Sequence, residues 1–241
     1  MIMDWLAERR RMLGMMKENV RSFKDFISKS SIVNSFYSYS SNVTIPINTE
    51  NSTKYVIAML VDITTLSLHN CMTINKISNG VVTNLFSYSS NNRDELIASA
   101  SGTSALLFNK NCIGIVIDPL DLNMASCDEL LRSASVIDIA NKNGGNGSTI
   151  AIQNPYQKGA KYVIAGLSKQ ITSSGMKVVK VDSDISFTEL ASSGDTDNLL
   201  TGVRTDNSDH GFWYVYSNSD NFGGVAVDTF NEGICALSFE E

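Results

Sequence analysis

Residues 54–60 read Lys-Tyr-Val-Ile-Ala-Met-Leu and recur almost unchanged at residues 161–167 as Lys-Tyr-Val-Ile-Ala-Gly-Leu. Each block is an uninterrupted run of β-branched, aromatic and other apolar residues, a composition that favours a strand. Since successive side chains of a strand point to opposite faces, both faces of such a strand are apolar. We therefore expect each block to lie centrally in a sheet that is covered on both sides.

Two further pairs of blocks keep the same order along the chain, so chance recurrence is a poor explanation. Residues 72–77 (MTINKI) match residues 176–181 (MKVVKV), and residues 114–118 (GIVID) match residues 224–228 (GVAVD). The spacing between paired blocks drifts only slightly, as changes in loop length after a duplication would produce. The sequence therefore predicts two similar β-rich domains.

Asn, Gly and Ser residues separate the two copies and favour flexible or left-handed backbone. We predict a first β-domain over residues 54–140, a linker over 141–149 and a second β-domain, a repeat of the first, over 150–241. The first copy is expected to end with a short helix at residues 128–133 and a last strand near 136–139. The size of each copy and the lack of helical crossovers favour antiparallel β-sandwich-like domains.

The start of the chain has a different pattern. We predict an amphipathic α-helix over residues 1–30 and an extended connector with one or two strands over residues 31–53. Apolar side chains fall at alternating steps of three and four, broken only by Arg9, at Ile2, Leu6, Leu13, Met16, Val20, Phe23 and Ile27. Such a heptad stripe is typical of helices that share a coiled coil. Burial of the same stripe on the chain's own β-domains is the alternative interpretation.

The expected fold class is therefore mainly β, with an N-terminal helix and two tandem antiparallel β-sandwich-like domains. The chain has 25 acidic and 19 basic residues and a net charge of -6, which argues against a protein that wraps nucleic acid with its whole surface. Basic residues within 8–24 form either a solvated face or a docking site for an acidic partner. We expect no membrane span and no signal peptide, and hence synthesis in a cytoplasm.

Residues that could carry chemistry lack the spacing of known sites. His69 and His210 lie among turn residues, the four cysteines form no C-x-x-C pair, and no glycine-rich phosphate loop is present. We predict no enzymatic activity and no catalytic, cofactor-binding or metal-binding residues. Asp195 and Asp197 could offer oxygen ligands to calcium, but their loop lacks the glycine and distal glutamate of an EF-hand. Two interpretations of this loop are therefore possible, a solvated acidic loop and a cation site. A hydrolase that uses these acidic loops is the third functional hypothesis.

Residues 212–216, Phe-Trp-Tyr-Val-Tyr, form a dense aromatic strand. Alternation places Trp213 on one face and Tyr214 on the other, so at least one aromatic set belongs to the core. The other set could stack on a sugar or a protein, which makes Trp213 and Tyr214 candidate ligand-binding residues. Burial of both faces is the alternative.

Residues 5–16, Trp-Leu-Ala-Glu-Arg-Arg-Arg-Met-Leu-Gly-Met-Met, resemble the starts of structural proteins from gut bacteriophage virions. The resemblance covers this segment alone. It implies an assembly or attachment helix ahead of β-rich display domains, as in head fibres, decoration proteins and tail appendages. The expected partners are then further copies of the chain, with a trimer favoured, and other virion proteins. An adhesin that binds a host surface glycan or receptor is the second hypothesis.

Overall fold

The computed structural model describes residues 17–38, 43–60, 71–89, 96–110, 112–143, 149–153, 156, 158–169, 173–183, 186–194, 199–202, 212–217 and 232–240. Strands dominate this part of the chain, and all of the strand pairs are antiparallel. The prediction of a mainly β fold is therefore confirmed.

The described elements fall into two halves, each with one helix followed by eight strands. The first half contains α2 (Phe23–Ser28), β1 (Ser31–Ser38), β2 (Val43–Pro46), β3 (Thr53–Leu60), β4 (Cys71–Ser78), β5 (Val81–Ser89), β6 (Ala98–Ser101), β7 (Ala105–Phe108) and β8 (Cys112–Asp118). The second half contains α3 (Met124–Ser133), β9 (Ser135–Asn143), β10 (Thr149–Gln153), β11 (Tyr162–Lys169), β12 (Ser173–Val181), β13 (Phe187–Gly194), β14 (Leu199–Gly202), β15 (Phe212–Ser217) and β16 (Glu232–Glu240).

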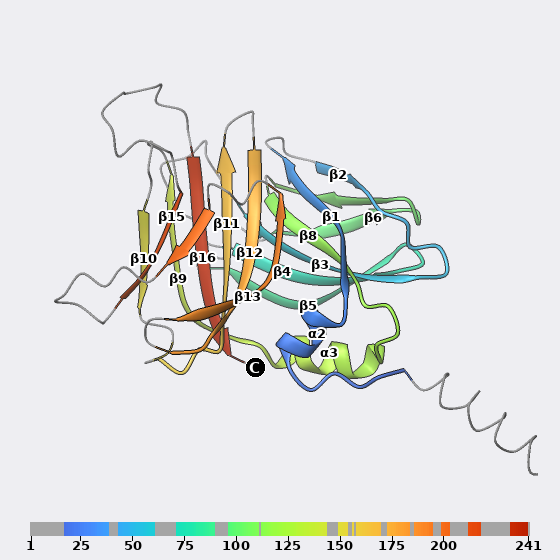
Figure 1. The fold of residues 1–241 in the computed structure, drawn as a ribbon. Helices are drawn as coiled ribbons and strands as arrows, with labels where there is room; N and C mark the ends of the chain where they lie inside the picture. Colours follow the sequence, from blue (N-terminus) through green and yellow to red (C-terminus); the bar gives the residue numbers. More distant parts are fainter. Residues whose placement is uncertain are drawn as a thin grey trace, which may run out of the picture.

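The two halves have the same sheet topology. The first half forms a five-stranded sheet in the order β1-β8-β3-β4-β5 and a three-stranded sheet in the order β2-β7-β6. The second half forms sheets in the orders β9-β16-β11-β12-β13 and β10-β15-β14, which match the first pair strand for strand. Figure 1 shows the blue-to-green strands of the first half beside the yellow-to-red strands of the second. This agreement supports an internal duplication, as the recurring blocks predicted.

Even the irregularities of the sheets recur. Leu85 is an extra residue in β5 opposite β4, and Leu190 is an extra residue in β13 at the same place opposite β12. Val33 in β1 and Ile137 in β9 are extra residues at matching positions against β8 and β16. A β-bulge bends its strand and increases the local twist, so both halves curve at the same points.

The β3 strand is buried on both faces, as its uniformly apolar sequence predicts. Tyr55, Ile57 and Met59 point into the core that lies between the two five-stranded sheets. Val56 and Ala58 point to the opposite side, where they pack with residues of β7 such as Leu106. The first five-stranded sheet is therefore the middle layer between its own three-stranded sheet and the second half.

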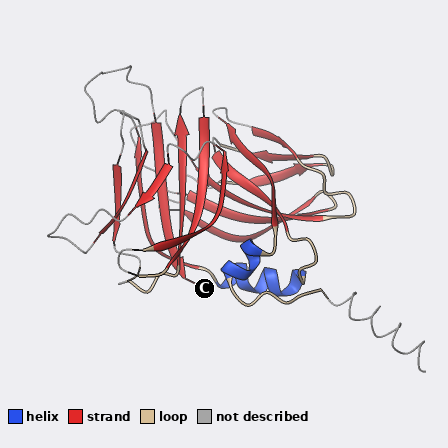
Figure 2. Ribbon diagram, in the orientation of Figure 1, coloured by secondary structure: helices blue, strands red, loops and turns tan. Residues whose placement is uncertain are grey.

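The core between the two five-stranded sheets is built by both halves. Ile57 and Ile115 of the first half and Ile164 and Val178 of the second belong to one cluster of buried side chains, which we call the shared core. The three-stranded sheet of the second half packs on the outer face of its own five-stranded sheet. Figure 2 shows both helices at one end of the sheets. The two halves therefore share an apolar interface and are not independent domains joined by a flexible linker.

The structure places the domain boundary earlier than the sequence analysis does. β9, which contains the strand predicted to end the first domain, pairs with β16 of the second half. Residues 141–143 of the predicted linker continue β9, and residues 144–148 lie outside the described part of the chain. Polar residues are tolerated there because β9 is an edge strand, whose outer side needs no partner strand. The second half therefore begins with α3.

Two other sequence assignments are corrected. The segment at residues 31–53, predicted as an extended connector with one or two strands, does contain two strands, but β1 and β2 are integral members of the sheets of the first half. The third recurring block was matched to the wrong residues: the topological counterpart of β8 is β16, whereas residues 224–228 lie outside the described segments. The true pair, residues 114–118 and 236–240, occupies the same register position beside β3 and β11 but has little sequence similarity.

Candidate functional site

Only the end of the predicted N-terminal helix falls within the described residues, and there the prediction is partly wrong. Residues 17–22 are not helical. The Ser22 side chain accepts a hydrogen bond from the backbone N–H of Asp25 at 3.1 Å, which makes Ser22 the N-cap of α2. Serine is a preferred N-cap because its hydroxyl satisfies a free backbone donor. One continuous helix through residue 30 is therefore excluded for this stretch.

The apolar residues of this end are buried in the chain's own core. Val20, Phe23 and Ile27 are 8%, 2% and 5% exposed, and all three belong to the shared core together with Phe26. For these residues the predicted helix interface is wrong and the alternative, packing on the chain's own β-sheets, is correct. The two five-stranded sheets leave an apolar end between them, and α2 covers it. The remaining predicted interface residues, Ile2, Leu6, Leu13 and Met16, lie outside the described residues.

The segment before α2 is pinned to the segment before α3. The backbone N–H of Glu18 donates to the carbonyl of Asp121 at 3.0 Å, and the N–H of Asn123 donates to the carbonyl of Glu18 at 2.7 Å. The N–H of Val20 donates to Ser126 Oγ at 2.9 Å. Glu18 and Val20 therefore fix the start of the described chain at the point where the two halves meet.

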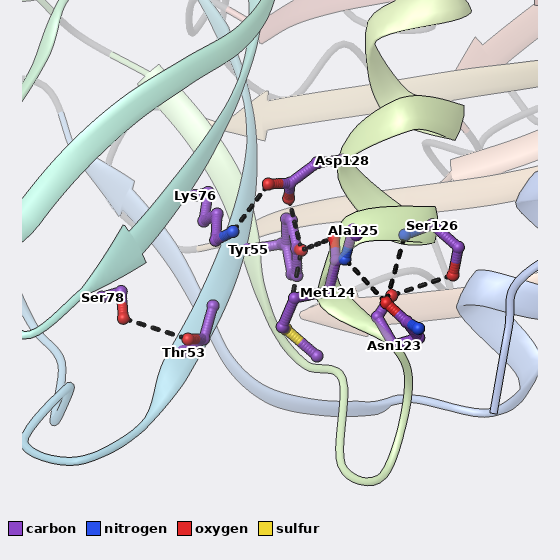
Figure 3. A network of polar contacts seen from close by, with 9 residues as sticks. All are labelled: Thr53, Tyr55, Lys76, Ser78, Asn123, Met124, Ala125, Ser126 and Asp128. Atoms are coloured by element: carbon purple, nitrogen blue, oxygen red, sulfur yellow. Dashed lines mark hydrogen bonds and ion pairs between the residues drawn. The ribbon is translucent and has the colours of Figure 1, made fainter. Parts of the chain in front are cut away.

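Each helix also contacts the other half of the molecule. Tyr55 of β3 donates its hydroxyl hydrogen to Asp128 Oδ1 of α3 at 2.7 Å, and Lys76 Nζ of β4 donates to Asp128 Oδ2 at 2.6 Å (Figure 3). Tyr162, the counterpart of Tyr55, accepts a hydrogen bond from the backbone N–H of Lys24 in α2 at 3.3 Å. The two helices are thus exchanged between the halves, as in a symmetric dimer whose subunits make reciprocal contacts.

Tyr55, Lys76 and Asp128, with the neighbouring Cys127, form what we call the exchange site, and its role is structural. Burial, followed by the hydrogen bond to Asp128, raises the pKa of the Tyr55 hydroxyl. Burial, followed by the charge of Asp128, raises the pKa of the neighbouring Cys127 thiol to about 11. Both groups are protonated at neutral pH, and a thiol in that state is a poor nucleophile. The site therefore joins the halves and offers no activated group.

A polar cleft of about 390 Å³ opens next to the point where the halves meet, and we call it the junction cleft. It is lined by the turn before β3, the β4–β5 turn, the end of β8 with the link to α3, and Lys17. An ion pair between Lys54 Nζ and Asp118 Oδ2 lies in its wall. The two side chains are 13% and 26% exposed, so solvent reaches the pair only in part.

The backbone is unusual at three places around the junction cleft. Asn51, Asn79 and Leu120 have φ angles of 53°, 48° and 48°, and within the described residues they are all of the non-glycine residues with positive φ. Asparagine adopts this conformation readily, and Asn79-Gly80 is a typical hairpin turn. Leucine does not, because its Cβ crowds the following carbonyl oxygen. Strain of this kind tends to gather at functional sites.

The other predicted site residues are not brought together by the described structure. Trp213 and Tyr214 lie in β15, but their side chains are outside the described part, as are Asp195, Asp197, His69 and His210. Within the described residues no group of three or more His, Cys, Asp or Glu side chains could hold a metal ion. No helix of the described segments is long and apolar enough to cross a membrane.

No protein family model, curated protein or solved structure matches this chain. The site must therefore be judged from its own geometry. Sequence reasoning missed the junction cleft because its residues come from separate turns that each have an ordinary loop composition. The Asn-Gly pair at residues 79–80 was the one available signal, and by itself it indicates only a hairpin.

Proposed function

We propose that this chain is a non-enzymatic structural protein of a bacteriophage virion, a component of a head fibre, decoration or tail appendage. In this proposal residues 1–16 make the assembly or anchoring contact, and the duplicated β body projects from it. The observation that carries the proposal is the attachment of residues 17–30 to the chain's own core, because it leaves only residues 1–16 of the predicted helix for a partner.

The sequence of residues 1–16 suits such a contact. It keeps the first four residues of the predicted apolar stripe, Ile2, Leu6, Leu13 and Met16, next to three consecutive arginines at 9–11. Apolar side chains at helical spacing gain free energy when another surface removes them from water. The adjacent guanidinium groups favour an acidic partner surface or fix the register of an assembly.

The body described above suits a projecting or decorating role. A pinned start at Lys17 means that a load on residues 1–16 would pass directly into the point where both halves meet. The interlocked helices and the shared core oppose separation of the halves under that load. The resemblance of residues 5–16 to phage virion proteins supports the same role.

Deletion of residues 1–16 tests this proposal. We expect the full-length chain to form a homo-oligomer, with a trimer favoured, and the truncated chain to be a folded monomer, because the deletion spares Val20 and α2. Native mass spectrometry measures the assembly, and circular dichroism measures the fold.

A double substitution provides the matched control for the deletion. Leu6→Glu with Leu13→Glu should abolish assembly, whereas Glu8→Gln, on the polar face of the predicted helix, should leave the mass of the assembly unchanged. A truncated chain that assembles with the same number of copies as the full-length chain would contradict an anchoring role for residues 1–16.

A further inference from the structure

We propose that the junction cleft binds a pyranose sugar. This goes beyond the proposed assembly role, because it concerns recognition by the β body and does not involve residues 1–16. The cleft volume of about 390 Å³ is within the range of small-ligand sites, roughly 300–1,000 Å³. What favours a sugar is the division of the cleft into a polar wall and an aliphatic wall.

The two walls differ in chemistry. The polar wall comes from the turn before β3 and the β4–β5 turn, and it includes Asn51, Ser52 and Asn79. The strand order β8-β3-β4 puts the segment after β8 on the other side of β3 from the β4–β5 turn, and this side contributes Pro119, Leu120 and, at the start of α3, Met124. A pyranose ring carries hydroxyl groups around its rim and C–H groups on its face. A cleft with one hydrogen-bonding wall and one aliphatic wall matches both parts of such a ring.

The charges of the cleft favour a neutral ligand that both donates and accepts hydrogen bonds. Lys54 and Asp118 neutralise each other, so an isolated anion or cation would have to compete with an existing ion pair. Asp118 already accepts from Lys54 Nζ and, through Oδ1, from the backbone N–H of Leu120 at 3.1 Å. A carboxylate accepts about four hydrogen bonds, so capacity for a sugar hydroxyl is left.

The residues with left-handed backbone at the cleft also support a binding site. Leu120 has a left-handed backbone and is 53% exposed, so its side chain gains little burial in return for a conformation that glycine would adopt freely. Asn51 and Asn79 also have left-handed backbone, so amide and aliphatic side chains line the cleft at positions where glycine would cost less.

Saturation-transfer NMR on the full-length protein tests the proposal. The probes are the methyl glycosides of glucose, galactose, mannose and N-acetylglucosamine, with glucuronic acid as an acidic arm that reports any contribution of Lys17. We expect weak binding, on the order of 1 mM, since a ligand of about a dozen heavy atoms has little surface to bury. At least one probe should receive saturation from the protein.

Two variants locate the binding without unfolding the protein. Leu120→Gly removes the aliphatic rim and Asn79→Gly removes an amide, and glycine tolerates the left-handed backbone at both positions. Each should weaken binding at least tenfold. Ile97→Ala, which shortens an equally exposed aliphatic residue outside the cleft, should leave binding unchanged.

Two results would overturn the proposal: no saturation of any probe at millimolar concentration, or saturation that survives in both glycine variants. Either result leaves the mass of the assembly untouched, so failure of the sugar site and failure of the assembly role are distinguishable.

Discussion

Replacing Phe26 with alanine is expected to lower the free energy of unfolding by about 3–5 kcal/mol. Phe26 is fully buried in the shared core. Its ring lies edge-on to Tyr55, with centroids 5.3 Å apart, and 6.0 Å from the ring of Phe23. The substitution removes these contacts and leaves a cavity next to Tyr55. Chemical denaturation of the full-length chain measures the change.

The control for Phe26 lies on the same helix. Lys24 is exposed, so Lys24→Ala should change the stability by no more than about 0.5 kcal/mol. A Phe26→Ala protein as stable as the Lys24→Ala protein would mean that α2 is not part of the core. The interpretation of residues 17–30 as an intermolecular interface would then return.

The substitution Gly114→Val is expected to cost about 3 kcal/mol or more, or to prevent folding. Gly114 is buried in β8, and a Cβ at this position would lie 2.3 Å from the ring of Phe36 and 2.6 Å from the backbone oxygen of Ile57. The second contact cannot be relieved by a side-chain rotation, because it is made by the backbone of the neighbouring strand. Overpacking of a dense core usually costs about 1–3 kcal/mol, and a backbone overlap exceeds that range.

Gly102→Ala separates overlap from backbone strain. Gly102 has a φ of 65° but nothing lies within 4 Å of a Cβ placed there, so only the conformational cost of about 1 kcal/mol is expected. Thermal denaturation of both variants compares the two effects. If the Gly114→Val protein lost no more stability than the Gly102→Ala protein, Phe36 and Ile57 would not lie as close to β8 as the structure places them.

The likeness of the two halves could be predicted from the sequence because a central strand buried on both faces tolerates few changes. Residues 55–60 and 162–166 are buried, and almost any change there meets other atoms. β9 is an edge strand, which the sequence pattern assigns to the end of the first copy, whereas β16 is an interior strand like β8 and yet has little sequence similarity to it. Periodicity shows which faces of a strand are apolar, but it does not show which strand far away in the sequence pairs with it.

The helix at the chain start was overextended for a related reason. A stripe at Val20, Phe23 and Ile27 is equally well buried by a partner helix or by the chain's own sheets, and the pattern is the same in both cases. Ser22 was the signal that could have limited the helix, since it precedes residues 23–28 as an N-cap. The junction cleft was not predictable, because its walls are joined by contacts such as the Lys54–Asp118 ion pair, whose residues lie far apart in the sequence.

The central structural claim is that both halves share one core and unfold together, so that the start at Lys17 is anchored to a single cooperative body. Differential scanning calorimetry of Ile57→Ala and Ile164→Ala tests it directly, because each isoleucine is fully buried in the shared core and comes from a different half. We predict one transition whose calorimetric and van't Hoff enthalpies agree, and a shift of that whole transition to lower temperature in either variant. Two separate transitions, with each variant lowering only one of them, would contradict the shared core.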